Sequence, residues 1–333
     1  MTDDSNDSVS RRQAMGTAAA AGLAATAAGT ASAKAGAPTA APLTDPTTKY
    51  PKPPFQRQEQ PWPGLASRMN PRPDHGETSY KGSGRLQGRK ALVTGGDSGM
   101  GRAAAIAYAR EGADVAISYY PTEEPDAKEV IDLIRREGRI AVALPGDIRD
   151  AGHCKRMVEE AVQKLGGLDI LVNNAGRQQQ RQSLLELTDE DLDATLKTNT
   201  YAMVWITRAA LPHLKPGATI IQTTSEQAYD PSENLVDYAM TKAAAMNFTK
   251  SLAKQLAPKG IRVNGVAPGP IWTPLQVSGG ATMDALEKFG SKAPMGRPGQ
   301  PVELGSIYVQ LAAADASYAT GQVYGSAGGG GQP

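Results

Sequence analysis

The chain has 333 residues, of which 40% are apolar, so it is long enough for one large or two small domains around a buried core. Its formal net charge of +1 argues against nucleic acid or a membrane surface as a partner, because both attract strongly basic proteins. The lone Cys154 excludes an intramolecular disulfide framework, and the scattered His75, His153 and His213 lack ligand spacing, so we expect no metal site.

Residues 1–33 have the features of an export signal. The pair Arg11-Arg12 precedes a weakly apolar stretch rich in Ala, Gly and Thr, and residues 31–33 have the small-x-small pattern of a cleavage site. The segment resembles a twin-arginine signal, which predicts a periplasmic protein; the alternative is an Ala-rich tail on a cytoplasmic one. Because the stretch is too weakly apolar to span a bilayer, we expect no membrane span in the mature chain.

Residues 34–84 form a Pro-rich arm in front of the main domain, residues 85–333. The closely spaced prolines favour an extended, polyproline-like backbone. Phe55, Trp62 and Leu65 give the arm apolar surface to bury. We therefore expect the arm to pack against the main domain or a neighbouring subunit.

A glycine-rich turn opens the main domain. Residues 89–94 read as a buried strand, residues 95–101 as a turn, and residues 102–111 as a helix. A strand, a glycine turn and a helix in direct succession place backbone amides and a helix N-terminus around a pyrophosphate. The predicted dinucleotide contacts here are Gly95, Asp97, Ser98, Gly99, Met100 and Gly101.

Strands and helices then alternate. Strands are predicted at 114–118, 140–144 and 168–172, with helices at 124–137 and 151–165. This alternation indicates an α/β fold with one doubly wound parallel sheet, in which ligands lie beyond the carboxyl ends of the strands. The candidates at those ends are Ser118, Tyr119, Asp147, Ile148, Asn174, Ala175 and Gly176. Asp147 could accept a hydrogen bond from an adenine amino group or be a solvated loop residue.

Tyr238 and Lys242 are four apart in a predicted helix and therefore share one face of it. A nearby ammonium can lower the pKa of a phenol, which is ordinarily about 10, into a range that is useful for proton transfer. Ser225 follows the predicted strand 219–222, where it would present a hydroxyl. Asn199 lies in the middle of a predicted helix that Thr188 begins and that runs towards Leu214.

The C-terminal third supplies a further strand at 262–267 and the turn Pro268-Gly269-Pro270. Residues 274–298 read as a mobile flap over the substrate or as an ordinary surface insertion. Residues 317–324 are predicted to form the last strand.

Several motifs together resemble the classical short-chain dehydrogenase/reductase family over residues 85–330. They are TGGDSGMG at 94–101, NNAG at 173–176, PGPIWT at 268–273, and the four positions Asn199, Ser225, Tyr238 and Lys242. Residues 60–86 are also similar to a subgroup that includes bacterial general-stress and glucose/ribitol-dehydrogenase-like proteins.

The resemblance implies a single Rossmann domain, a homotetramer, and a role for each of these residues. Ser225 would bind the substrate oxygen, Tyr238 would exchange a proton with it, and Lys242 would bind the nicotinamide ribose. Asn199 would hold a water molecule that links the lysine to solvent. The segment containing Pro268, Gly269, Ile271 and Thr273 would contact the nicotinamide carboxamide.

The choice between NAD and NADP stays open. An acid that would select NAD is missing at the end of the second strand, where Ser118-Tyr119-Tyr120 stand. Arg102 is the basic residue closest in sequence to the turn, whereas Asp97 within the turn would repel a 2′-phosphate.

The substrate and even the activity have alternatives. The polar run 177–182 after NNAG favours a polyol, a sugar or a small polar carbonyl compound, or is simply a solvated loop. We expect an alcohol/carbonyl oxidoreductase; the alternative is a catalytically silent protein that binds a dinucleotide as a sensor or scaffold.

Overall fold

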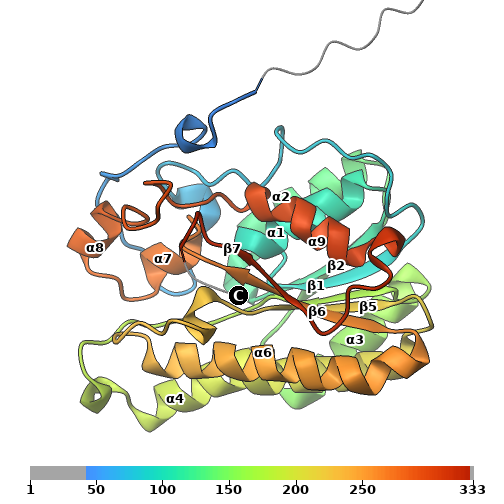
Figure 1. The fold of residues 1–333 in the computed structure, drawn as a ribbon. Helices are drawn as coiled ribbons and strands as arrows, with labels where there is room; N and C mark the ends of the chain where they lie inside the picture. The colour runs from blue at the N-terminus through green and yellow to red at the C-terminus, as the bar shows by residue number, and fades with distance from the viewer. Residues whose placement is uncertain (1–42, 331–333) are drawn as a thin grey trace, which may run out of the picture. The chain divides into compact units, whose positions relative to one another are not determined.

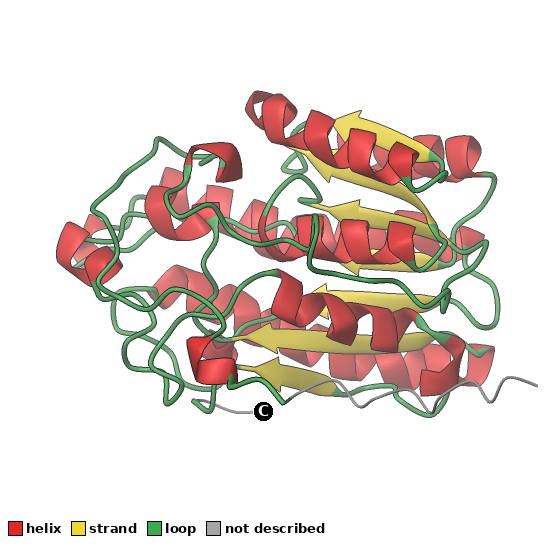
Figure 2. Ribbon diagram, turned by 90° about the horizontal axis from the view of Figure 1, so that it is seen from above, coloured by secondary structure: helices red, strands yellow, loops and turns green. Residues whose placement is uncertain are grey.

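A computed structural model of the protein describes residues 43–330, so the predicted export signal lies outside the described residues. In this range seven parallel strands form one sheet in the order β3-β2-β1-β4-β5-β6-β7 (Figure 2). They are β1 Lys90–Thr94, β2 Asp114–Tyr119, β3 Ala141–Pro145, β4 Ile170–Asn173, β5 Thr219–Thr223, β6 Arg262–Pro268 and β7 Val323–Ser326. The predicted doubly wound α/β fold is confirmed.

Helices cover both faces of the sheet (Figure 1). The bounds on one face are α1 Gly99–Arg110, α2 Glu124–Arg136 and α9 Val302–Ala312, and on the other α3 Ala151–Leu165, α5 Ala202–Ala210 and α6 Val236–Leu256. Alternate residues of β1 serve the two cores, since Val93 packs on the first face and Leu92 on the second. Burial on both faces explains why the strands read as continuous apolar runs.

The helix predicted from Thr188 towards Leu214 is continuous, but a π-helical turn interrupts its regular hydrogen bonding. Thr188 caps α4, Asp189–Leu196, which lies beside α6, and a π-helical turn, Lys197–Tyr201, joins α4 to α5. In this turn the amide of Ala202 donates to the carbonyl of Lys197, five residues back. Such single turns within α-helices often occur at functional sites.

The last strand is shorter than predicted. Only Val323–Ser326 pair with β6, although the sequence indicated a strand from residue 317. Side chains of β6 hold the preceding chain in a turn instead: Asn264 donates to the carbonyl of Ala319 at 2.7 Å, and Arg262 to that of Ala313 at 3.0 Å. Backbone groups held in this way are not available to a ladder.

The arm from Thr44 onward belongs to the same compact unit as the sheet. The Phe55 ring stacks on Trp272 with centroids 4.3 Å apart, and the Trp272 indole donates to the carbonyl of Pro71 at 2.8 Å. Trp272 precedes two short helices beyond β6, α7 Pro274–Ser278 and α8 Met283–Glu287. Within residues 43–330, no helix has both the length and the apolar character to cross a membrane.

Candidate active site

A crevice with about 1030 Å³ of empty space, part of it open to solvent, lies beyond the carboxyl ends of the strands. The sheet is built outward from β1 in two directions, first through β2 to β3 and then from β4 to β7. The strand order therefore reverses between β1 and β4, and open α/β sheets bind ligands at such a reversal. Of the residues predicted from the sequence, the following line it: Gly95, Asp97, Ser98, Gly99, Met100, Asp147, Ile148, Asn174, Ala175, Gly176, Tyr238, Lys242 and Thr273.

The glycine turn fits a pyrophosphate. Gly99 begins α1 with a φ of +52°, and a Cβ atom at Gly101 would lie 2.0 Å from the carbonyl oxygen of Gly95. Ser98 occupies the N-cap, yet its side chain caps no amide of the helix. The first-turn amides of α1 are thus available to an anion at the positive end of the helix dipole.

Asn174 joins the ends of three strands beneath this turn. Its side-chain amide donates to the carbonyls of Thr94 at 3.1 Å and Gly95 at 3.2 Å, and its oxygen accepts from the Thr223 hydroxyl at 3.2 Å. The Thr94 hydroxyl in turn accepts from the amides of Asn174 and Ala175. The crevice floor is therefore held by polar side chains as well as by the sheet.

Tyr238 and Lys242 project from the first turns of α6 at the catalytic end of the crevice. Both are buried, and the Lys242 ammonium donates to the carbonyl of Thr223 at 2.9 Å while lying 5.4 Å from the centroid of the Tyr238 ring. Ser225, which follows β5, lies close enough to the Tyr238 phenol to lower its pKa. The structure therefore brings the three predicted side chains together.

The pKa values differ from the sequence expectation. Burial raises the pKa of Tyr238 to about 12, partly offset by the nearby Ser225 hydroxyl, whereas the expectation was a pKa lowered by Lys242. Burial also lowers the pKa of Lys242 to about 8. The reason is that desolvation disfavours both charged forms, and the ammonium is bonded to a carbonyl rather than directed at the phenolic oxygen.

Asn199 lies in the π-helical turn, close to the lysine. Its side chain donates to the carbonyl of Arg177 at 2.8 Å and to the hydroxyl of Thr241 at 3.0 Å. A Cβ atom added at Gly176 would be 3.7 Å from both the Asn199 oxygen and the Lys242 nitrogen. Asn199 and Lys242 also share the lining of a small cavity behind the crevice.

Six predicted cofactor contacts do not line the crevice: Gly101, Ser118, Tyr119, Pro268, Gly269 and Ile271. β2 continues through Tyr119, one residue further than predicted, and the Tyr119 hydroxyl bonds to Glu124. Gly101 instead permits the tight turn beneath the crevice. Pro268 completes β6, Gly269 packs against Ala327, and Ile271 is buried beside Gly299.

The basic residue at the cofactor site is not the one expected from the sequence. Arg102 is only 1% exposed and is paired with Glu77 and Glu129, so it does not face the crevice. Arg149 lines the crevice instead, and its guanidinium pairs with Asp147 at 2.6 Å. This pairing holds the pKa of Asp147 below its usual range and occupies the carboxylate that was a candidate adenine contact.

Residues that were not predicted as site residues also line the crevice. Tyr120 and Glu123 follow β2, and Trp62, Pro63 and Gly64 come from the arm. The first two could have been found from their position after a strand. The arm residues carry no such signal.

Acidic groups gather where β2 meets α2. Burial and the nearby Asp97 raise the pKa of Glu123, and burial likewise raises that of Asp97, which also feels Asp126. One oxygen of the Asp97 carboxyl is buried without a hydrogen-bond partner among the described residues. Glu123 therefore favours its protonated form at neutral pH, and the pKa of Asp97 is raised to about 7.

Residues 95–330 match the family model described as enoyl-(acyl carrier protein) reductase. The chain is 55% identical over 285 residues to the uncharacterized oxidoreductase YghA of Escherichia coli (strain K12), covering 86% of this chain and 97% of the relative. It is 48% identical over 274 residues to general stress protein 39 of Bacillus subtilis (strain 168), covering 82% and 95%. With the glucose and ribitol dehydrogenase of Daucus carota it shares 42% over 275 residues, covering 81% and 94%.

Solved structures show the same fold with dinucleotides bound. A short chain dehydrogenase from Burkholderia cenocepacia J2315 in complex with NADP superposes with a TM-score of 0.69 at 37% identity, covering 74% of this chain and 98% of that one. The 3-ketoacyl-(acyl-carrier-protein) reductase from Brucella melitensis, complexed with NADH, gives a TM-score of 0.66 at 33% identity, covering 73% and 98%.

Proposed function

The chain belongs to the short-chain dehydrogenase/reductase family as an NAD(P)-dependent oxidoreductase, and we propose that it interconverts small polar alcohols, such as polyols or sugars, with their carbonyl compounds. One observation carries the proposal: the buried cluster of Ser225, Tyr238 and Lys242 adjoins a crevice whose other part is a glycine turn suited to a pyrophosphate.

In the proposed reaction, Ser225, Tyr238 and Lys242 each have one role. The Ser225 hydroxyl binds the substrate oxygen, and the Tyr238 phenol gives that oxygen a proton in reduction or removes it in oxidation. Lys242 and the glycine turn hold the dinucleotide, which supplies or accepts a hydride when bound. Because Tyr238 is protonated at neutral pH, it is ready to act as the acid in carbonyl reduction.

Lys242 also affects the ionisation of the Tyr238 phenol. The Lys242 ammonium is bonded to the Thr223 carbonyl at 2.9 Å, and its pKa of about 8 keeps it largely charged at neutral pH. A cation 5.4 Å from the ring centroid favours the phenolate that forms when Tyr238 has donated its proton. Asn199, in the π-helical turn, would hold the water molecule that links this lysine to solvent.

The substrate class rests on the polar run 177–182, which lies against the residues that follow α7; Ser278, the last residue of α7, lines the crevice. Gln178 is buried against the loop that follows α7, and the amide of Gln180 donates to the carbonyl of Gly279 at 2.8 Å. Side-chain amides can pair with substrate hydroxyls. The name of the Daucus carota relative, a glucose and ribitol dehydrogenase, points to the same class.

The substitution Tyr238→Phe tests the proposal. It should leave NADH and NADPH binding intact, because the aromatic ring remains, and lower kcat by about 10²–10⁴-fold, because the proton donor is lost. Turnover of a panel of sugars, polyols and aldehydes is followed by absorbance at 340 nm, the band of the reduced nicotinamide. The matched control is Tyr229→Phe, since Tyr229 has no lysine four residues later.

Two outcomes would contradict the proposal. Undiminished turnover by the Tyr238→Phe variant would remove the tyrosine from the mechanism. If the unaltered protein binds a dinucleotide but turns over nothing in the panel, a sensor or scaffold role is favoured. Comparing KM for NADH and NADPH in the same assays identifies the preferred cofactor.

We also propose that the chain forms a homotetramer. Apolar side chains remain exposed on the π-helical turn, α5 and α6: Tyr201 is 45% exposed, Val204 37%, Val236 50% and Met240 51%. Such a patch on a folded domain favours self-association. Sedimentation velocity measures the state directly, and a monomer would contradict the proposal.

Export to the periplasm by a twin-arginine-type signal is a further proposal, with a cytoplasmic protein as the alternative. Its support is the sequence of residues 1–33 alone, which lie outside the described residues. Fractionation of cells that express the chain with Arg11→Lys and Arg12→Lys should show retention in the cytoplasm. Unchanged accumulation outside it would contradict export.

A further inference from the structure

The arm contributes directly to the crevice. Trp62, Pro63 and Gly64 line it together with the glycine turn and Tyr238. These arm residues precede the matched family region, which begins at residue 95. Part of the crevice wall is therefore supplied by a segment outside the part of the chain that defines the family.

Trp62 lies opposite the glycine turn. Its ring centroid is 5.6 Å from that of Tyr120, which follows β2, and the Arg177 guanidinium is 5.9 Å from the indole centroid. Arg177 follows NNAG at the end of β4, and β1 lies between β2 and β4 in the sheet. The indole thus spans the crevice above the turn that follows β1.

The segment 60–65 around Trp62 is closed on itself. The Gln60 side chain accepts from the amide of Leu65 at 2.8 Å and donates to the carbonyl of the same residue at 3.0 Å. These two bonds join both ends of a short loop that presents the indole. Because the loop is stapled in this way, Trp62 is held in place rather than free to swing aside.

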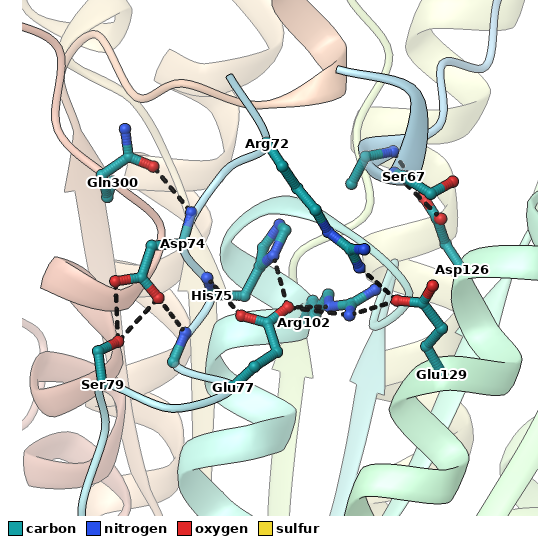
Figure 3. A network of polar contacts seen from close by, with 12 residues as sticks. Ser67, Arg72, Asp74, His75, Glu77, Ser79, Arg102, Asp126, Glu129 and Gln300 are labelled. Carbon is teal, nitrogen blue, oxygen red and sulfur yellow. Dashed lines mark hydrogen bonds and ion pairs between the residues drawn. The ribbon is translucent and has the colours of Figure 1, made fainter. Parts of the chain in front are cut away.

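Both ends of this loop are fixed to opposite walls of the crevice. On the α7 side, the amide of Gln60 donates to the carbonyl of Val277 at 2.9 Å. On the α2 side, the amides of Ala66 and Ser67 donate to the buried carboxylate of Asp126 at 2.6 and 3.3 Å (Figure 3). The loop is therefore a bridge from one wall to the other.

Further along, a buried ionic network holds the arm on α1, the helix that begins at the glycine turn (Figure 3). Arg102 of α1 pairs with Glu77 of the arm at 2.9 Å and with Glu129 of α2 at 2.8 Å. Glu77 also bonds to the fully buried His75. The Arg102 side chain is only 1% exposed, whereas Glu77 and Glu129 are 26% and 42% exposed; a buried cation is costly to leave without its partners, so the arm is anchored close to the crevice.

We propose that the loop 60–65 is a roof over the dinucleotide and that Trp62 is a cofactor-binding residue that slows cofactor release. Trp62 lines the same crevice as the glycine turn and Tyr238, so a dinucleotide bound there would lie against the indole, and its departure would require the bridge to open. The inference rests on the dinucleotide site of the proposed function, but it concerns release rather than chemistry.

The test is the rate of cofactor release from the full-length protein. The protein is loaded with NADPH or NADH and mixed in a stopped-flow instrument with an excess of the oxidised form, and the decay of reduced-nicotinamide fluorescence is followed. Trp62→Ala should accelerate release about tenfold, the effect of losing one aromatic stacking partner, and Trp62→Phe should restore most of the slow rate.

Two further variants complete the design. Trp205→Phe, on α5 away from the crevice lining, should leave release unchanged. Gln60→Ala removes the two side-chain hydrogen bonds to Leu65 but keeps the indole, so it should accelerate cofactor release less than Trp62→Ala does. This variant replaces Trp62→Ala as the test if Trp62→Ala sharply lowers the thermal midpoint of unfolding. Release from both arm variants within about twofold of the unaltered rate, less than 0.5 kcal/mol, would overturn the roof. Failure of the unaltered protein to bind either dinucleotide would overturn the proposed function as well.

Discussion

The crevice has an inner wall and an outer wall that are built differently. The inner wall consists of residues that follow the strands, such as the glycine turn and Asn174, and the outer wall is the loop 60–65 of the arm. Residues of the inner wall follow directly from strands of one sheet. The outer wall depends on contacts between segments that are more than 50 residues apart, as between Ala66 and Asp126.

The two walls therefore differ in how rigidly they are held. The inner wall is fixed by backbone geometry, because a parallel sheet brings all its carboxyl ends to one edge. The outer wall is held by side-chain hydrogen bonds and ion pairs, which can be opened without unfolding the sheet. We therefore expect substitutions in the inner wall to abolish binding and substitutions in the anchors of the arm to change rates and stability.

The largest effect is expected for Gly101→Ala, beneath the glycine turn of the inner wall. A Cβ atom there would be 2.0 Å from the Gly95 carbonyl and 2.5 Å from the Asn174 side chain. The turn must deform, so we expect a loss of about 3 kcal/mol in the free energy of unfolding and of about 100-fold in dinucleotide affinity. Urea denaturation and fluorescence titration measure the two quantities.

The matched control is Gly305→Ala on α9, where the nearest atom to an added Cβ is 3.6 Å away. Alanine there should be neutral or slightly stabilising, because it favours the helix. If both variants had the same free energy of unfolding and the same dinucleotide affinity, close packing beneath the turn would not be the reason for glycine at position 101.

A smaller effect is expected for Glu77→Gln in the anchor of the outer wall. The substitution removes the negative charge that pairs with the guanidinium of Arg102, a residue only 1% exposed. It should lower the free energy of unfolding by about 2 kcal/mol. Cofactor release should also become faster as the arm loosens. The control Arg57→Gln breaks pairs whose arginine is 59% exposed, and should change stability by less than about 0.5 kcal/mol. Identical losses in both variants would contradict the special weight of the buried anchor.

The smallest effect is expected for Glu123→Gln, beside the inner wall. Burial and Asp97 raise the pKa of Glu123 above the ordinary 4.5, so the folded protein holds a proton that the unfolded chain releases as the pH rises past 4.5. Glu123 therefore costs stability increasingly with pH, whereas glutamine stays neutral. We expect the variant to be more stable by about 1 kcal/mol at pH 8 and equal to the unaltered protein near pH 4. A difference that did not change with pH in urea denaturation would exclude this titration.

Most of the inner wall could be predicted from the sequence. Thirteen of the predicted residues line the crevice, and α3 has the predicted bounds, Ala151–Leu165. The misses have local causes. β2 runs one residue further than expected, so Tyr120 takes the place assigned to Ser118 and Tyr119. Arg102 sits on a helix face that the arm buries, a contact that no pattern within α1 reveals.

The sequence by itself determined the alternation of strands and helices, the glycine turn, and the spacing that puts Tyr238 and Lys242 on one helix face. These features are local, because hydrophobic periodicity and glycine at a tight turn act over a few residues. Only the tertiary structure decided where the Pro-rich arm runs and that Trp62 covers the crevice. A segment without periodicity has no preferred partner of its own, so its path is set by distant groups such as Asp126, Val277 and Arg102.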